Sequence, residues 1–224
     1  MKKVIVISLG GSRIIPDKVD INFLKQFKKV IDKISKKTKV VVCTGGGKIA
    51  RDYIQALKNF KVENKKQSLV GISATRLNAR LVAAILNANE EILTKISQVK
   101  KLLKKYDVVV CGGIKPGITS DGVTAEIAKF VKADALVNIT NVKGLYDKDP
   151  RKFKNAKFIP EISHENFAKI ISKVKEEPGQ HFVLDSLAAK ITQENKIKVV
   201  ILKDIKQLQN YLENKKFIGT IIKK

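Results

Sequence analysis

The chain has 224 residues, 44% of them hydrophobic and 29% charged, and its formal net charge is +24. This composition excludes an intrinsically disordered protein, and the length suits one domain with a substantial core. Its two cysteines are too few for a disulfide framework or a four-thiolate metal site, and no apolar run approaches the roughly 18 residues of a membrane span. We therefore expect a cytoplasmic protein that makes no membrane contact.

Short apolar runs rich in β-branched residues alternate with helical patterns along the chain. The runs are continuous, as expected of parallel strands that are covered on both faces. We expect strands at residues 4–9, 40–43, 107–111, 135–140, 197–202 and 217–222.

Apolar residues at three- and four-residue spacing predict helices between these strands. Asp20 and Asp204 can each cap a helix, because an aspartate oxygen accepts the free N–H groups of a helix start. This order predicts one domain over residues 1–224, a three-layer α/β/α sandwich with a mainly parallel sheet. The expected helices begin after Asp20, near Ile49, at 76–89, around Ile127, at 164–175, at 187–194 and after Asp204.

Glycine turns follow three of the expected strands, at residues 10–12, 45–48 and 112–121. The carboxyl ends of parallel strands meet at one edge of a sheet, where α/β proteins bind ligands. Glycine allows close approach of the backbone, and free N–H groups at helix starts suit phosphate oxygens. A single glycine turn could reflect only the conformation of a tight turn, but three such turns at one edge predict a polyphosphate or two-phosphate site.

The sequence contains no P-loop pattern G-x-x-x-x-G-K-[ST]. Residues 45–50 fit the dinucleotide fingerprint G-x-G-x-x-A only loosely, and they follow the second strand rather than the first. A Rossmann oxidoreductase is therefore a weak alternative.

The high positive charge raises the question of a nucleic-acid partner. Only five of the 45 basic residues are arginine, and the lysines are spread along the chain. Sequence-specific nucleic-acid readers favour arginine and clustered basic faces. We therefore do not expect nucleic acid as the main partner, because an anionic small molecule would be attracted equally well.

Six motifs give the sequence a resemblance to a known family. They occur in the order typical of the amino acid kinase family, and the similarity runs from the first expected strand to the last. Within this family the chain is most similar to the archaeal uridylate (UMP) kinase branch. The motifs are ISLGGS (7–12), TGGGKIAR (44–51), SATRLNA (73–79), GGIKPGITSD (112–121), NITNVKGLYDKDP (138–150) and LDSLAAK (184–190).

The resemblance implies transfer of the γ-phosphoryl group of ATP to UMP, with Mg²⁺, in pyrimidine nucleotide biosynthesis by a homo-oligomer, a hexamer. We expect Asp121, Arg51 and Lys190 to be catalytic, and we expect no dedicated metal ligand. The residues implied for ATP are Gly10, Gly11, Ser12, Gly47, Arg51, Thr140, Asn141, Tyr146 and Asp149. Those implied for UMP are Gly46, Ser68, Ile114, Lys115, Pro116, Gly117, Ile118, Thr119 and Ser120.

The sequence departs from the family pattern at three positions, of which Ser120, in place of the second threonine of the usual T-T-D, is a mild change. Many relatives carry a phosphate-facing lysine where this chain has Ser8, and archaeal members commonly have a ribose-binding aspartate where it has Ser68. We expect Lys190, or otherwise Lys48, to replace the missing lysine. Asp121 could instead be a simple helix cap.

Two other functions remain open from the sequence. One is a different phosphotransferase of the same family, acting on a carboxylate, a carbamate or an isoprenyl phosphate. The other is an inactive relative that binds nucleotides or RNA through its basic surface.

Overall fold

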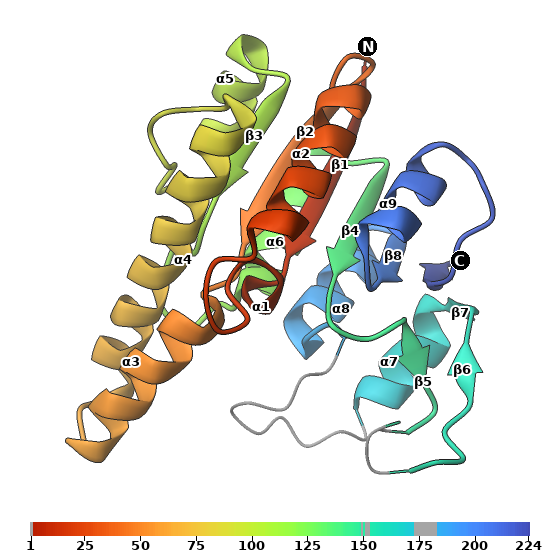
Figure 1. Cartoon of the computed structure of the whole chain (residues 1–224). Helices are drawn as coiled ribbons and strands as arrows, with labels where there is room; N and C mark the ends of the chain where they lie inside the picture. Colours follow the sequence, from red (N-terminus) through yellow and green to blue (C-terminus); the bar gives the residue numbers. More distant parts are fainter. Residues whose placement is uncertain (1, 149, 151–152, 173–182) are drawn as a thin grey trace.

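The computed structural model describes residues 2–148, 150, 153–172 and 183–224 (Figure 1). Its central sheet has seven strands in the order β3-β2-β1-β4-β8-β9-β7. Strands β1 to β4 and β8 are parallel, whereas β9 runs antiparallel to β8. The strands are β1 (Lys3–Leu9), β2 (Thr38–Thr44), β3 (Val108–Cys111), β4 (Ala135–Ile139), β7 (Glu161–Ser163), β8 (Val199–Leu202) and β9 (Thr220–Lys223).

The helices begin close to where the apolar spacing predicts them. Asp20, Asp185 and Asp204 each cap a helix, because their carboxylates accept the N–H three residues later. The helices are α1 (Gly11–Ile14), α2 (Ile21–Ile34), α3 (Gly47–Asn59), α4 (Asn64–Leu86), α5 (Gln98–Lys105), α6 (Ser120–Val131), α7 (His164–Ile171), α8 (Ser186–Glu194) and α9 (Ile205–Leu212).

Side chains of each strand alternate between two apolar layers, one on either face of the sheet. Ile7 and Val42 point into the layer covered by α2, α4 and α9. Val6 and Val41 point into the layer covered by α5, α6, α7 and α8. The sheet with its two helical layers is the expected three-layer α/β/α sandwich (Figure 1).

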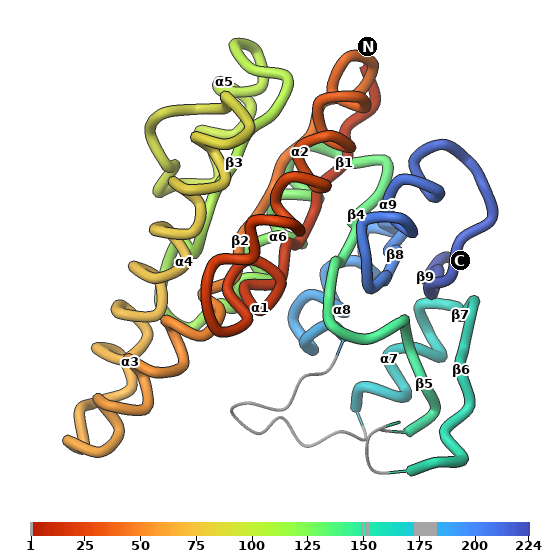
Figure 2. The backbone as a smooth tube through the Cα atoms, in the orientation of Figure 1, coloured from red at the N-terminus to blue at the C-terminus, as the bar shows by residue number. Residues whose placement is uncertain are grey.

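Four features differ from the sequence predictions. Helix α4 starts at Asn64 rather than 76, because its first part packs against α3 instead of the sheet (Figure 2). The short helices α1 and α5 and the short strands β5 (Leu145–Tyr146), β6 (Phe158–Ile159) and β7 were not predicted. Strand β9 lies antiparallel to its neighbour β8, which apolar runs alone cannot reveal. Helix α7 ends at Ile171, and residues 173–175 of the helix predicted at 164–175 lie outside the described residues.

Helix α4 also corrects an expectation about membranes. It has 23 residues and an 18-residue window of mean hydropathy 1.4, so by length and composition alone it could span a bilayer. The expectation that no apolar stretch approaches the length of a membrane span was therefore wrong. The helix packs on β2, β3, α2 and α3, and Ala79, Val82 and Ala83 are buried there. Such packing explains its apolar content as that of a core helix.

Candidate active site

The strands that carry the glycine turns end at the same level of the sheet. Leu9 of β1 pairs with Thr44 of β2 and with Ile139 of β4. Cys43 pairs with Cys111 at the end of β3. The turns after β1, β2, β3 and β4 therefore meet at one edge of the sheet, as the sequence predicts.

The first two glycine turns are packed backbone to backbone. A Cβ atom on Gly11 would lie 2.0 Å from the N atom of Gly47, and one on Gly45 would lie 2.6 Å from the N atom of Gly11. Gly47 also has a positive φ of +63°, a conformation that other residues rarely adopt. These glycines are required for the turns to fit together, so their presence does not by itself demonstrate a ligand.

The turn after β3 is different, because part of it is open. Gly112 packs so tightly on α4 that a Cβ atom there would lie 2.8 Å from the carbonyl carbon of Thr75. Gly117 has a φ of +81°, and nothing lies within 4 Å of the place where its Cβ would be. Lys115, Pro116 and Gly117 are exposed. The start of this turn is fixed, whereas its tip is accessible to a ligand.

A cluster of polar side chains lies between β1, α6 and α8. The Ser8 hydroxyl donates to the Asp121 Oδ1 atom at 2.7 Å. The Thr119 hydroxyl donates to Asp185 and accepts the N–H of Gly122, so Thr119 is the cap of α6. Asp121 is therefore not the cap of this helix, and its carboxylate is directed to Ser8 instead.

The surroundings of Asp121 favour its neutral form. Desolvation by the protein raises the pKa of Asp121 to about 6, and the nearby charge of Asp185 acts in the same direction. The hydrogen bond from Ser8 lowers this pKa but only partly offsets the two other effects. A carboxyl group with a pKa near 6 at the edge of a candidate site can be neutral or charged depending on what binds beside it.

The turn after β4 is anchored by the last strand. The N–H of Leu145 donates to the Thr220 Oγ1 atom at 2.8 Å, and the ring of Tyr146 packs edge-on against Phe158 at 5.4 Å. Asn141 is exposed and Thr140 is partly exposed, so both side chains are accessible for contact with a nucleotide. Asp149 lies outside the described residues.

Arg51 and Lys190 both lie on helices that start at this edge. Arg51 is exposed one turn into α3. The side chain of Lys190 on α8 is 72% exposed, and its Nζ atom lies 4.0 Å from Glu194. Lys48 is held 2.7 Å from Asp52, and the hydrogen bond to Asp52 is the main reason that its pKa is raised. Neither lysine contacts Ser8 or Asp121 within the described part of the chain.

Ser68, which the sequence predicts to contact UMP, lies on the same face of α4 as Ile72. Ile72 and Thr75 contact Gly113 at the start of the turn after β3. Ser68 is one helical turn before Ile72, and residues four apart lie on the same helix face. Ser68 is therefore on the face that meets this turn, one turn further along the helix.

Sequence reasoning gave no separate role to Arg76 and Asn78, although both belong to a motif that it used. Asn78 is buried and donates to the Gly45 carbonyl at 2.8 Å. Arg76 donates to the carbonyls of Gly113 and Ile114. The sequence signal that could have indicated these contacts is the presence of polar residues within an apolar stretch of the predicted helix.

A divalent cation such as Mg²⁺ needs oxygen ligands. No cluster of three His, Cys, Asp or Glu side chains suited to a metal occurs among the described residues. Asp121 and Asp185 offer carboxylate oxygens, and Mg²⁺ is usually held by one or two carboxylates together with substrate phosphates. These residues fit an Mg²⁺ ion that arrives with a nucleotide.

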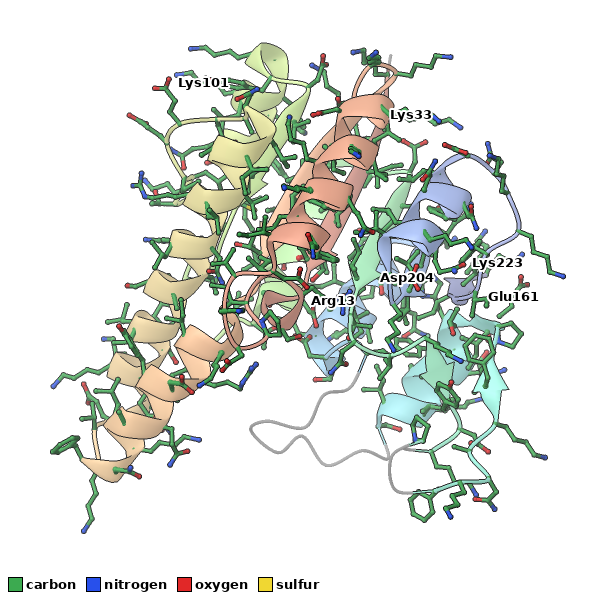
Figure 3. The ribbon with its side chains drawn as sticks, in the orientation of Figure 1. Arg13, Lys33, Lys101, Glu161, Asp204 and Lys223 are labelled. Atoms are coloured by element: carbon green, nitrogen blue, oxygen red, sulfur yellow. The ribbon has the colours of Figure 1, made fainter. Side chains whose placement is uncertain are left out.

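The two cysteines form a buried pair, and the charged side chains of the described residues are dispersed. Cys43 and Cys111 are buried, and their Sγ atoms lie 3.0 Å apart. The hydrogen bond with Cys43 and burial raise the pKa of Cys111, which keeps this thiol protonated and unreactive. Figure 3 shows that Lys33, Lys101 and Lys223 come from separate elements, which fits a dispersed positive charge.

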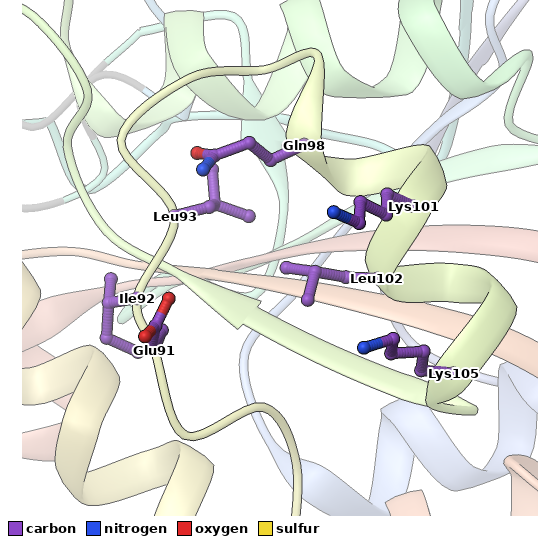
Figure 4. Close-up of a pocket in the computed structure, with 7 residues that line it drawn as sticks. All are labelled: Glu91, Ile92, Leu93, Gln98, Lys101, Leu102 and Lys105. Atoms are coloured by element: carbon purple, nitrogen blue, oxygen red, sulfur yellow. The ribbon is translucent and has the colours of Figure 1, made fainter.

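A separate hollow of about 260 Å³ lies beside α5 (Figure 4). None of its lining residues belongs to the glycine turns. Its apolar wall includes Ile92, Leu93 and Leu102, and Lys101 and Lys105 project at its rim.

The fold and the edge together define an α/β protein whose glycine turns meet at one end of a mainly parallel sheet. Comparison with known proteins gives the family. The model of the amino acid kinase family matches residues 3–203, and the chain belongs to this family.

Three known proteins illustrate the similarity. The uridylate kinase of Thermococcus sibiricus is 38% identical over 200 residues, which are 88% of this chain and 89% of that protein. The crystal structure of uridylate kinase from Archaeoglobus fulgidus superposes with a TM-score of 0.88 at 33% identity, covering 99% of this chain and 100% of that one. The UMP kinase structure from Ureaplasma parvum gives a TM-score of 0.84 at 25% identity, with full coverage of both chains.

Proposed function

We propose that this chain is a uridylate kinase, which transfers the γ-phosphoryl group of ATP to the phosphate of UMP and yields UDP and ADP. The observation that carries the proposal is the meeting of the glycine turns at one edge, with the starts of α3 and α6 beside them. Similarity to proteins named uridylate kinase or UMP kinase supports the choice of UMP as the acceptor.

Phosphoryl transfer brings two anionic groups into line, so most of the catalysis is positioning and neutralisation of charge. The rigid pair formed by the first two turns suits the donor phosphates. We assign Gly10, Gly11, Ser12 and Gly47 to this side, and Arg51 supplies a guanidinium group that can bind phosphate oxygens in a fork.

The acceptor side consists of the turn after β3 and the facing side of α4. We assign UMP to Gly46, Ser68 and residues 114–120. Exposure of Lys115, Pro116 and Gly117 supports this role, because a nucleotide must reach the backbone of the turn.

We assign the ATP nucleoside to Thr140, Asn141, Tyr146 and Asp149.

Bound Mg²⁺ would neutralise charge on the phosphates. Asp121 and Asp185 are the residues that fit such an ion, and the pKa of Asp121 near 6 would fall as a cation approaches. Lys190 and Lys48 remain the candidates for the lysine that is absent at Ser8.

We also propose that the chain works in the cytoplasm as a homo-oligomer, a hexamer. The α3–α4 hairpin projects beyond the sheet (Figure 2). Several large apolar side chains of this hairpin are exposed. Tyr53 is 59% exposed, Phe60 is 83% exposed and Leu77 is 56% exposed. Exposed apolar side chains on a projecting hairpin support a contact with another copy of the chain.

Light scattering tests the oligomer. A hexamer has a mass about six times the 24.9 kDa of one chain. A Tyr53→Glu, Phe60→Glu double variant should shift the mass to smaller species, whereas Phe153→Glu, which changes an exposed aromatic residue outside the hairpin, should not. A wild-type mass of one chain would contradict the proposal.

The activity is tested by incubating the purified protein with ATP and UMP and separating the nucleotides by chromatography. We expect UDP and ADP in equal amounts, and we expect chelation of Mg²⁺ to abolish both. Absence of UDP at millimolar substrates, with the protein folded by circular dichroism, would reject the assignment.

A further inference from the structure

One short stretch of helix α4 contacts both the turn after β2 and the turn after β3. The Thr44 hydroxyl donates to the Thr75 carbonyl at 2.9 Å, and the Thr75 hydroxyl accepts the N–H of Gly113 at 2.7 Å. Asn78 donates to the Gly45 carbonyl. One turn of helix therefore ties the turn after β2 to the turn after β3.

Arg76 makes the most specific of these contacts. Its Nε atom donates to the Gly113 carbonyl at 2.9 Å, and its Nη2 atom donates to the Ile114 carbonyl at 3.1 Å. The guanidinium group thus binds two consecutive peptide groups at once. A planar fork of donors can do this, whereas a single ammonium group cannot fix both in the same way.

These contacts determine the direction of two N–H groups. The described residues contain no cis peptide bonds, and a trans peptide points its C=O and N–H in opposite directions. Since the carbonyls of Gly113 and Ile114 point toward Arg76, the N–H groups of Ile114 and Lys115 point away from it. The next residue, Pro116, has no N–H group.

The two N–H groups are available to a ligand. No hydrogen bond within the described part of the chain uses the N–H of Ile114 or Lys115. Consecutive N–H groups that face the same way form a concave site for an anion. The exposed Lys115 and the open space at Gly117 leave this place accessible.

We propose that Arg76 is a positioning residue for the acceptor, which aims the N–H groups of Ile114 and Lys115 at a phosphomonoester. This inference rests on the proposed function for the identity of the acceptor, but the orientation of the peptides does not depend on it. Arg76 acts through the backbone of the turn.

The test compares three variants on the same helix. Arg76→Met removes the fork, Arg76→Lys keeps the charge without the fork, and Arg80→Met is the control, because Arg80 is exposed one turn later. We expect both Arg76 variants to raise the KM for UMP roughly tenfold or more, with the KM for ATP within about twofold of wild type. Arg80→Met should leave both constants within about twofold.

Hydrogen–deuterium exchange provides a readout that is independent of turnover. Millimolar inorganic phosphate should slow exchange in the segment 112–121 of the wild type and of Arg80→Met, but not of Arg76→Met. Thermal unfolding and circular dichroism show whether each variant is folded. If Arg76→Met does not fold, Arg76→Lys serves for both measurements.

The outcomes separate the two proposals. A wild type that forms no UDP but shows phosphate protection lost in Arg76→Met rejects the proposed function and keeps the role of Arg76. Full recovery of the KM for UMP in Arg76→Lys would overturn the positioning role, because charge alone would then suffice. Equal protection by phosphate in wild type and Arg76→Met would also overturn it.

Discussion

Two conflicting demands act on the carboxyl group of Asp121. Ionisation would make the carboxylate available to the Mg²⁺ ion of the proposed function, but the desolvated surroundings and Asp185 disfavour ionisation, so the pKa rises from the ordinary value of 3.8 to about 6. A carboxyl group with a raised pKa adds stability only while it is protonated. Its contribution is therefore complete below about pH 4 and is lost as the pH rises through about 6.

Asp121→Asn should remove the free-energy cost of keeping an ionised carboxylate in these desolvated surroundings. At pH 7 and without nucleotide, we expect the free energy of unfolding to rise by about 1–3 kcal/mol, because one pKa unit corresponds to about 1.4 kcal/mol. We expect activity to fall at the same time. Urea unfolding at pH 4.5 and pH 7.5 measures the effect, with Asp32→Asn on α2 as the control. A stability gain of the same size at both pH values would contradict the prediction.

Arg51→Ala should weaken catalysis without weakening the fold. Removing a charged stabiliser from a preorganised site costs about 2–4 kcal/mol of transition-state stabilisation. Because Arg51 is exposed on α3, the melting temperature should barely change. Lys58→Ala on the same helix is the matched control. A kcat/KM within about threefold of wild type would show that Arg51 is only a surface residue.

Lys190→Met and Lys48→Met decide which lysine replaces the one absent at Ser8. Charge develops on the transferring phosphoryl oxygens, and a flexible ammonium group can reach it from either helix. We expect Lys190→Met to lower kcat at saturating UMP and ATP more than Lys48→Met does, because Asp52 already holds Lys48. If both variants keep kcat within a few-fold of wild type, no lysine fills this role.

At the scale of elements, the glycine turns define the edge of the sheet. A methyl group on Gly11 would meet the backbone of Gly47 and Gly45, which cannot move aside as a flexible side chain could. The first two turns should therefore behave as one structural unit.

Gly11→Ala should destabilise the protein by more than about 3 kcal/mol, because backbone would have to shift in both turns. Gly71→Ala on α4 is the control, since the new methyl would meet only the end of Ile54 at 3.2 Å and alanine favours a helix. Chemical denaturation of both variants measures the difference. A Gly11→Ala protein as stable as Gly71→Ala would contradict the packing argument.

The sequence predicts the buried parallel strands well, because each is a continuous β-branched run such as Val40–Val42. Its predictions are weaker where tertiary contacts decide the structure. The first part of α4 forms on α3, and β7 has only three residues. For the site, the spacing of the glycines predicts the edge of the sheet. The hydrogen bonds of Arg76 with Gly113 and of Ser8 with Asp121 could not be predicted, because they join residues far apart in the chain.

At the scale of the whole molecule, the positive charge is spread over many elements and partly paired at the surface. Lys33 pairs with Glu213 at 2.6 Å, and Lys223 pairs with Glu161 at 3.0 Å. Such exposed pairs add little stability. The net charge still attracts anions of every kind, so it does not choose between UMP and another acceptor.

The acceptor is therefore the central claim, and one experiment tests it directly. ADP release from ATP is measured side by side with UMP, CMP, carbamate, a glutamate derivative and isopentenyl phosphate, with RNA added in a parallel set. We expect UMP to give the highest kcat/KM, by roughly tenfold or more over each other acceptor, a difference of about 1.4 kcal/mol. A higher kcat/KM with any other acceptor, or no turnover together with salt-dependent RNA binding, would contradict it.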